Sequence, residues 1–361
     1  MQALAGRVLT ARGWALARVV FDARIQALEP LSEAPRRYVL PGFIDLHVHG
    51  GGGGDAMEGA AGVRRLARFH ARHGTTALLA TTVTAPPAAV VRALEGIRAV
   101  ARRPGAGEAR VLGAHLEGPF IHPERLGAQP PYPHPPDLDW ARRFLEAGPV
   151  RVVTLAPELG GALELVRFLA GRGVRVQLGH STAGFVEARA ALEAGAVGFT
   201  HLFNAMGGLM ARAPGLVGAA FARGRWAEVI PDGRHVHPGA LLAAFRAIPG
   251  VYGVTDAVAA AGMPEGRYPL GARTVVRRGD GVYLEDGTLA GSVLTMAEAL
   301  RNLVRLGLSL AEAAWRLSAL PAAYLGVRDR GRVRAGVWAD LVVLDEALRV
   351  REVYVEGRRV R

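Results

Sequence analysis

The alternation of hydrophobic and polar residues divides the chain into two β-rich ends and a different middle. Residues 1 to about 40 alternate in short runs (ALAGRVLT, ALARVVF, RIQAL), a pattern typical of small antiparallel strands. The closing residues return to it with ADLVVLD, VREVYVEG and RRV. Two regions far apart in sequence are therefore of one kind.

From Pro41 onward, apolar β-rich runs alternate with stretches of Ala, Leu and Arg at helical spacing, which predicts successive βα units around a parallel sheet. We count eight such runs: FIDLHVH, TALLATTV, VLGAHLEG, RVVTLAPE, VRVQLGHS, VGFTHLFN, AEVIPDGR and YGVTDAV. This number indicates an α/β fold of the (β/α)8 TIM-barrel type, since a doubly wound sheet normally has fewer strands per domain.

Two further segments interrupt the βα pattern. The Pro-rich stretch at 129–136 predicts a rigid loop after the third strand, on the side where barrels keep their active sites. Residues 269–289 predict a β-hairpin that turns at Gly279-Asp280-Gly281, inserted after the eighth strand.

Imidazole and carboxylate side chains occupy the carboxyl ends of several predicted strands. In a barrel these ends meet on one face, so residues distant in sequence come together there. Such groups are the usual ligands of a divalent transition metal. The six are His47, His49, Glu117, His180, His201 and Asp256.

The spacing of the histidines sharpens this hypothesis. His47 and His49 are two residues apart on a strand and so point to the same side. The glycine run at 50–54 lacks the spacing of a nucleotide-binding loop and allows close backbone approach instead. We expect His115 to pack inside the barrel, and His70 and His73 to be exposed on a helix.

Composition removes whole mechanisms. The chain has no Cys and no Lys, so all 44 basic residues are Arg. A Schiff-base lysine, a phosphate-binding P-loop lysine, a cysteine nucleophile and cysteine-ligated zinc are therefore excluded. The absence of cysteine fits a cytoplasmic protein. Charged residues interrupt every apolar stretch before the ~20 residues that a membrane span needs, which predicts a soluble chain with no membrane partner.

The net charge of +12 raises the question of nucleic acid. The arginines occur in ones and twos along the whole length, with no dense basic tail and few neighbouring aromatic residues. This distribution argues against a dedicated nucleic-acid surface, and we expect no such partner.

A serine-hydrolase reading competes with the metal site. Ser181, in the run GHSTA, follows a strand and precedes a helix, which is close to a nucleophile elbow, and the run HGGG from His49 resembles an oxyanion-hole loop. That fold requires a nucleophile, an acid and a histidine in this order, and no histidine follows His237. The order of residues therefore favours the metal site.

The ordered motifs PGFIDLHVHG, AHLEGPFIHP, LGHSTA, THLFNAM, PDGRHVHP, VTDA and LAGSVLTM resemble the amidohydrolase superfamily, and within it the N-acetylglucosamine-6-phosphate deacetylases. They extend over residues 41–296. The resemblance implies a metal-dependent barrel at 41–326 and a small β-sandwich domain built from 1–40 and 327–361. It also implies hydrolysis of N-acetylglucosamine 6-phosphate to glucosamine 6-phosphate and acetate, and a homodimer.

The same resemblance assigns roles to individual residues. Glu117, His180 and His201 would bind one metal ion, His47 and His49 would build a second position, and the ion would be zinc, with Fe, Mn, Co and Ni as alternatives. Asp256 would be the catalytic acid and base, and His235 would contact the acetyl carbonyl. The substrate would be bound by Gly118, Asn204, Ala205, Arg212, His235 and Leu289.

Two departures from the family pattern leave alternatives open. Some members lack the paired histidines and use one metal, so either one or two ions are compatible with this chain. Gln129 stands where relatives often have a histidine, which puts one substrate contact in doubt.

Many binuclear amidohydrolases bridge their metals with a carboxylated lysine; without lysine, Glu117 is the candidate bridge. A non-catalytic barrel and a sibling deaminase or cyclic-amide hydrolase are the remaining alternatives.

Overall fold

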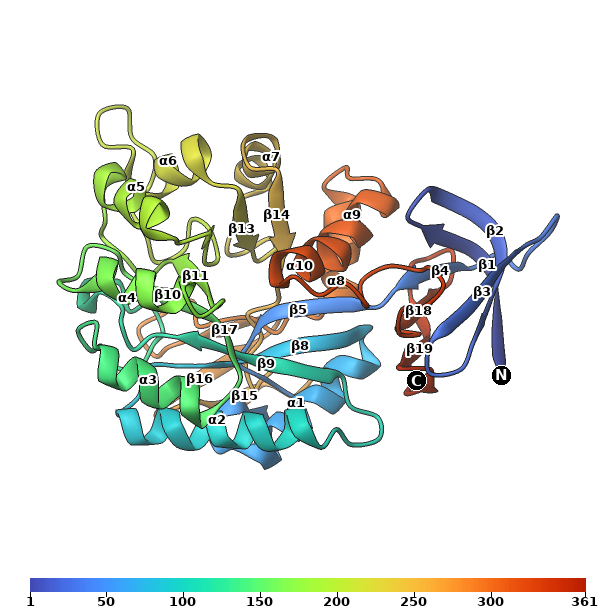
Figure 1. The fold of residues 1–361 in the computed structure, drawn as a ribbon, viewed down its shortest axis with the longest axis horizontal. Helices are drawn as coiled ribbons and strands as arrows, with labels where there is room; N and C mark the ends of the chain where they lie inside the picture. The colour runs from blue at the N-terminus through green and yellow to red at the C-terminus, as the bar shows by residue number, and fades with distance from the viewer.

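The computed structural model describes all 361 residues, Met1–Arg361, and places a barrel beside a smaller sheet (Figure 1). The barrel sheet has eight strands, and they pair in chain order with parallel neighbours. The strands are β5 (Phe43–Val48), β8 (Thr75–Thr82), β9 (Arg110–Glu117), β10 (Val150–Leu155), β11 (Arg175–Leu178), β12 (Gly198–Phe199), β13 (Trp226–Val229) and β14 (Gly250–Gly253). They are the eight predicted runs, so the predicted barrel is confirmed.

The two end strands of this sheet meet through the residues that follow β14. The backbone N–H of Asp256 donates to the His47 carbonyl at 2.9 Å, and the N–H of Gly50 donates to the Ala257 carbonyl at 2.8 Å. These bonds bring Asp256, which follows the last strand, against the histidine pair at the end of the first strand.

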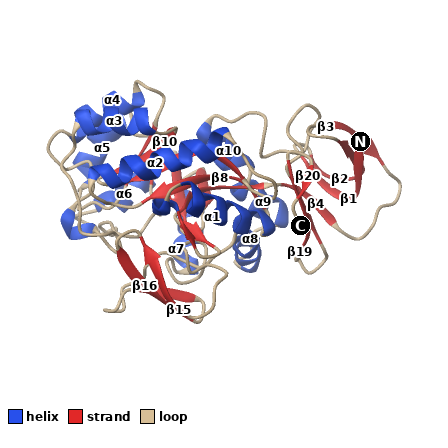
Figure 2. Ribbon diagram, turned by 90° about the horizontal axis from the view of Figure 1, so that it is seen from below, coloured by secondary structure: helices blue, strands red, loops and turns tan.

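Helices surround the sheet (Figures 1 and 2). They are α1 (Ala60–Arg72), α2 (Pro87–Arg102), α3 (Leu138–Ala147), α4 (Ala162–Ala170), α5 (Phe185–Ala194), α6 (Gly215–Arg223), α7 (Pro238–Ala247), α8 (Met296–Arg305), α9 (Leu310–Leu317) and α10 (Ala319–Leu325), with 3-10 turns η1 (Ala56–Glu58) and η2 (Pro123–Arg125). None of them combines the length and the apolar character that crossing a membrane requires.

The burial of α1 corrects one expectation. Its inward stripe consists of Val63, Leu66, Ala67 and His70, at the spacing of one helix face. The prediction that His70 is exposed is wrong: the side chain is fully buried, and its Nε2 bonds to the carbonyl of Gly50 at 2.9 Å. His115 is buried as expected, with Nδ1 at 3.1 Å from the Leu46 carbonyl.

The two ends of the chain form one seven-stranded sheet. Its order is β20-β19-β18-β4-β1-β2-β3. The members are β1 (Gln2–Thr10), β2 (Gly13–Phe21), β3 (Ile25–Pro30), β4 (Tyr38–Pro41), β18 (Leu341–Leu344), β19 (Val350–Val355) and β20 (Arg358–Arg359). Phe21 of β2 contacts Tyr354 of β19 edge to face, with ring centroids 5.2 Å apart. Because these strands are not neighbours in the sheet, the sheet curls around a hydrophobic core of its own.

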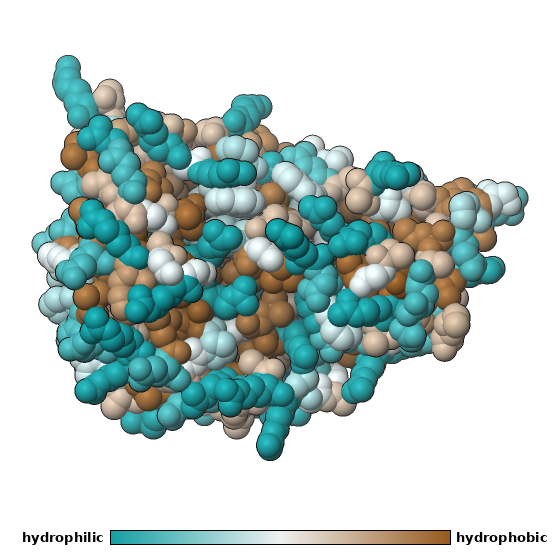
Figure 3. All heavy atoms as spheres, viewed as in Figure 1, coloured by the Kyte–Doolittle hydropathy of each residue, from teal (hydrophilic) through white to brown (hydrophobic).

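Two small sheets border the carboxyl ends of the barrel strands. The predicted hairpin is present as three antiparallel strands, β15 (Gly266–Leu270), β16 (Arg273–Arg278) and β17 (Gly281–Tyr283), which project from the barrel in Figure 2. The glycine run forms a tight hairpin of β6 (Gly50–Gly51) and β7 (Gly54–Asp55). On the face drawn in Figure 3, hydrophilic side chains are dispersed among apolar ones.

Candidate metal centre and active site

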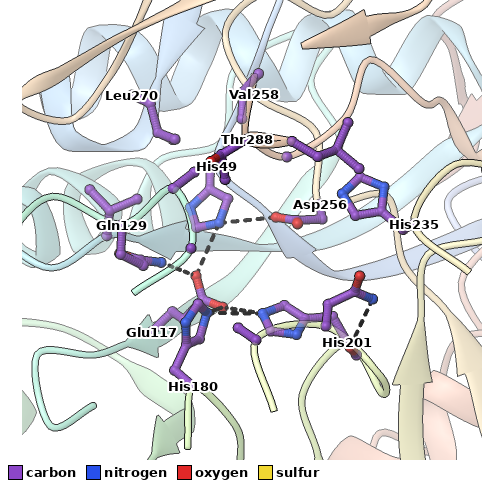
Figure 4. A pocket seen from close by; sticks show the side chains of 17 residues that line it. His49, Glu117, Gln129, His180, His201, His235, Asp256, Val258, Leu270 and Thr288 are labelled. Carbon is purple, nitrogen blue, oxygen red and sulfur yellow. Dashed lines mark hydrogen bonds and ion pairs between the residues drawn. The ribbon is translucent and has the colours of Figure 1, made fainter. Parts of the chain in front are cut away.

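The strand ends gather the polar residues at the floor of one pocket (Figure 4). His47 lies on β5 and Glu117 ends β9, while His180, His201 and Asp256 directly follow β11, β12 and β14. They arrange as two clusters of potential metal ligands. The outer cluster is Glu117, His180 and His201, and the inner cluster is His47, His49 and Asp256.

The outer cluster has three donor atoms aimed at one another. The Oε1 of Glu117 lies 3.2 Å from Nε2 of His180 and 3.0 Å from Nε2 of His201. The two Nε2 atoms are themselves 3.0 Å apart. The Nδ1 of His180 is 2.7 Å from the carbonyl of Arg125, so that nitrogen bears the proton and Nε2 offers its lone pair. Two imidazoles and a carboxylate in this arrangement fit a zinc-type ion.

The inner cluster repeats this arrangement beside it, with His47 fully buried. The Nε2 atoms of His47 and His49 are 3.2 Å apart, and Oδ1 of Asp256 is 3.1 Å from Nε2 of His49. The carbonyl of Thr81 lies 3.2 Å from Nδ1 of His49, which again places the proton away from the focal nitrogen. This second donor set also fits a divalent cation.

Glu117 belongs to both clusters. Besides its contacts in the outer cluster, it lies 3.4 Å from Nε2 of His47 and 3.2 Å from Nε2 of His49. Gln129 donates its amide hydrogen to Oε2 of Glu117, and its own oxygen accepts from the backbone N–H of Thr84 at 2.7 Å. The residue whose role was in doubt therefore holds the shared carboxylate.

Burial and mutual attraction set the charges of these groups. Burial would raise the pKa of Glu117, but His47 and His180 hold it well below its usual range. Burial would lower the pKa of His49, but Asp256 and Glu117 outweigh burial and raise that pKa to about 9. The pKa of Asp256 falls to about 2, because His47 and His49 outweigh its burial. Both carboxylates are ionised at neutral pH.

Three of the pocket's polar residues have a left-handed backbone that only glycine adopts freely. The φ angles are +49° for His180, +25° for His201 and +49° for Asp256. Such conformations cost of order 1–3 kcal/mol each and persist where the surrounding structure enforces them. The strand ends therefore turn sharply to aim these side chains into the pocket.

Glu228 is a site residue that the sequence analysis missed. It lies on β13, is fully buried, and its Oε1 is 2.6 Å from Nδ1 of His47. Burial would raise its pKa, but His47, together with His115 and His201, outweighs burial and lowers that pKa. The signal available in the sequence was a single acid within the apolar run AEVI, away from the end of the strand.

A second carboxylate and histidine pair lies at the wall of the pocket. The Nδ1 of His235 is 2.7 Å from Oδ2 of Asp232, and the His235 side chain lines the pocket. The hydrogen bond from His235 lowers the pKa of Asp232 against the effect of burial. His235 is thus fixed by an ionised partner, with Nε2 left as its free ring nitrogen.

The cavity measures about 220 Å³, which is somewhat smaller than the ~300–1,000 Å³ usual for small-molecule sites. Its upper wall includes Thr288 and Leu289 from the segment after β17, together with Leu270 of β15. Asn204 and Ala205 line it from the loop after β12. Gly118 follows Glu117 beneath this surface and is not a lining residue. Arg212 is exposed, in the loop before α6, and does not line the pocket either.

The serine alternative finds no support in these contacts. Ser181 is buried, and its hydroxyl donates to Oε2 of Glu158 at 2.8 Å. No histidine nitrogen is within hydrogen-bonding distance of this hydroxyl. Ser181 therefore stabilises the turn after β11.

Known proteins resemble this chain in sequence. The N-acetylgalactosamine-6-phosphate deacetylase of Escherichia coli is 42% identical over an alignment 373 residues long, which covers 98% of this chain and 97% of that protein. The N-acetylglucosamine-6-phosphate deacetylase of Vibrio furnissii is 37% identical over 89% of this chain and 82% of that protein.

Solved structures agree. A mutant N-acetyl-D-glucosamine-6-phosphate deacetylase of Mycobacterium smegmatis, in complex with N-acetyl-D-glucosamine-6-phosphate, superposes with a TM-score of 0.93 at 34% identity, over 99% of both chains. The deacetylase of Thermotoga maritima gives 0.92 at 32% identity, over 100% of this chain and 99% of that one. The model of the amidohydrolase family matches residues 38–360. With this match and these relatives, the chain belongs to the amidohydrolase family.

Proposed function

We propose that this protein is a metal-dependent deacetylase that hydrolyses N-acetylglucosamine 6-phosphate to glucosamine 6-phosphate and acetate. The observation that carries the proposal is the convergence of two ligand clusters, joined by Glu117, on the floor of a small-molecule pocket. The relatives named above support the substrate class. An enzyme of amino-sugar breakdown and cell-wall sugar recycling would act in the cytoplasm, which the lack of cysteine also favours.

The residues present would hold one or two divalent ions, with zinc favoured by the imidazole and carboxylate donors. When bound, such an ion lowers the pKa of water toward neutrality and polarises the amide carbonyl. Because Asp256 is ionised, it can accept the proton of the attacking water and then deliver it to the departing nitrogen. When both ring nitrogens of His235 carry protons, Nδ1 donates to Asp232 and Nε2 can donate to the acetyl oxygen.

The sugar would lie against the outer wall of the pocket. The amide nitrogen of Asn204 donates to the His201 carbonyl at 3.1 Å, which leaves its oxygen free to accept a hydroxyl of the sugar. The apolar side chains of Leu270 and Leu289 would cover the ring and exclude water. Gly118 would act by allowing the chain to turn after Glu117, with φ at +72°.

The phosphate raises a specific question, because no arginine lines the pocket. Arg212 offers the planar fork that suits a phosphate, but it is exposed on the loop that also exposes Leu209 and Met210. It would reach a phosphate either through movement of this loop or from a second copy of the chain. We propose a homodimer, and sedimentation of the purified protein tests it.

Arg212→Ala separates phosphate binding from catalysis. We expect KM for the phosphorylated sugar to rise about 10- to 100-fold, equivalent to the ~1.5–3 kcal/mol of a charged hydrogen bond, with free N-acetylglucosamine unaffected. Steady-state kinetics on both sugars measure this difference. Equal losses on the two sugars would refute the role.

A second candidate substrate is N-acetylgalactosamine 6-phosphate, which the 42%-identical relative in Escherichia coli favours. The two sugars differ only in the configuration of one ring hydroxyl. The deciding assay measures acetate release from each phosphorylated sugar by metal-free protein reloaded with Zn, Fe, Mn, Co or Ni. Release from neither sugar with any metal would reject the proposed function.

A further inference from the structure

We propose that Glu228 is a positioning residue that enables the chain to hold an ion at the inner cluster, by fixing the His47 proton on Nδ1 and by adding a third buried negative charge. This inference deepens the proposed metal-dependent function and rests on it. Glu228 neither lines the pocket nor contacts the ligand atoms of the inner cluster. We therefore expect it to act through His47, which it contacts at Nδ1.

The contacts of Glu228 are few and short. Its Oε1 lies 2.6 Å from Nδ1 of His47 and 3.1 Å from the backbone N–H of His201. Its Oε2 is buried without a hydrogen-bond partner. Neither Glu228 nor His47 has any exposed surface. Such a carboxylate is costly to bury, and the contacts with His47 and with the backbone N–H of His201 compensate this cost.

This contact decides which nitrogen of His47 is free. An ionised carboxylate only accepts hydrogen bonds, so Nδ1 of His47 must carry the proton. In the neutral imidazole the lone pair then lies on Nε2, which is 3.2 Å from Nε2 of His49 and 3.4 Å from Oδ1 of Asp256. For His49 the neutral carbonyl of Thr81 has the same orienting effect. Glu228 differs from that carbonyl in bringing a charge.

The charge of Glu228 matters because the two clusters contain few carboxylates. Glu117 and Asp256 are the only carboxylates in them, and together they offset half the charge of two divalent ions. The chain has no lysine that could be carboxylated to add another. Glu228 lies directly behind His47 and supplies a third negative charge where no water screens it.

A separate ion held by Glu228 itself is the competing reading, since His47, His115 and Glu228 lie close together. Both nitrogens of His115 are already engaged, however. Nδ1 faces the Leu46 carbonyl at 3.1 Å and Nε2 faces the hydroxyl of Thr154 at 2.7 Å. Because His115 has no free lone pair, these three residues do not form a metal-binding site. They hold His47 in position instead.

Glu228→Gln tests the charge while keeping an oxygen that can accept from His47. Protein stripped by a chelator is titrated with Zn²⁺, and bound zinc is counted by mass spectrometry after gel filtration. We expect two ions per wild-type chain. In the variant, the Kd of one of the two ions should rise about 10- to 100-fold, the usual effect of losing a group behind a ligand, with the Kd of the other ion unchanged.

A double-mutant cycle shows whether Glu228 acts through His47. His47→Gln removes the ligand, so adding Glu228→Gln to it should weaken zinc binding no further. Additive losses would mean that Glu228 acts independently of His47, which would overturn the inference. Glu108→Gln is the matched control, because Glu108 is a buried carboxylate paired with Arg64 and Arg68 away from both clusters. It should still bind two ions.

A measurement on the wild-type protein guards against variants that do not fold. Long-range proton–nitrogen NMR of the zinc-loaded chain should show a proton on Nδ1 of His47, and its absence would overturn the inference. Equal binding of both ions by wild type and Glu228→Gln would overturn it as well, as would a wild type that binds a single ion. If wild type binds no zinc and releases no acetate, the proposed function itself fails.

Discussion

The outer and inner ligand clusters have similar donors but different surroundings. In the outer cluster, His180 is oriented by a backbone carbonyl, and Nδ1 of His201 has no hydrogen-bond partner. In the inner cluster, His47 is held by a buried carboxylate and His49 by a carbonyl. The pocket reaches both clusters, yet His47 lies behind its wall. Similar ligand sets can therefore differ in how firmly the protein fixes them and in how much charge stands behind them.

The largest effect on both clusters is expected from removing Glu117, the carboxylate that they share. Glu117→Ala should empty both clusters, because Glu117 contacts all four histidines. We expect activity to fall by more than about 10⁴-fold, since a metal contributes several kcal/mol to such a transition state. Bound zinc and acetate release are measured together. Glu158→Ala, which alters a carboxylate outside the clusters, should keep its metal.

Asp256→Asn separates chemistry from metal binding. We expect turnover to fall by about 10²- to 10⁴-fold, the usual contribution of general acid–base catalysis, while the outer cluster still binds its ion. Acetate release and zinc content decide the matter. A variant that turns over normally would show that Asp256 is only a ligand.

The stability of the chain in acid tests the surroundings of the inner cluster, because His70 bonds to the carbonyl of Gly50, the residue after His49. Burial lowers the pKa of His70 from 6.5 to about 4. The unfolded chain then takes up the proton first, so stability is lost as pH falls from 6.5 toward 4. This loss amounts to about 2 kcal/mol at pH 5.

His70→Gln can still donate to Gly50 but does not titrate. Urea unfolding of the metal-free chain at pH 8 and pH 5 should therefore show a smaller loss for this variant than for wild type, by about 2 kcal/mol. Equal losses for both proteins would mean that the acid sensitivity arises elsewhere.

The smallest effect is expected for Ser181→Ala. Loss of the hydroxyl that donates to Glu158 should cost about 1 kcal/mol of stability and leave turnover near wild type. Thermal unfolding and acetate release measure the two quantities. Collapse of activity with the metal retained would revive the serine mechanism.

The barrel and most polar groups of the pocket floor were predictable, for a physical reason. Strands buried on both faces appear as continuous apolar runs, and an imidazole or acid at the end of such a run stands out. Burial of His70 was visible in principle, since it falls on the same helix stripe as Val63, Leu66 and Ala67.

Other features depend on contacts between distant segments. The partnership of Glu228 with His47 joins residues 181 positions apart, and no local pattern marks it. The left-handed backbone of His180, His201 and Asp256 is imposed by neighbouring strands against the local preference of these residues. The place of Arg212 relative to the phosphate depends on a loop that no periodic pattern describes.

The curled terminal sheet has a consequence for the order in which the molecule can be assembled. Strand β4 leads straight into β5, which bears His47, and one of its neighbours is β18, with Pro41 opposite Leu341. At synthesis rates of about 5–20 residues per second, β4 waits on the order of tens of seconds for that neighbour. Until then it presents an open edge, the kind of surface that invites wrong pairing. The first metal-binding strand thus gains its final support only after β18 has been synthesised.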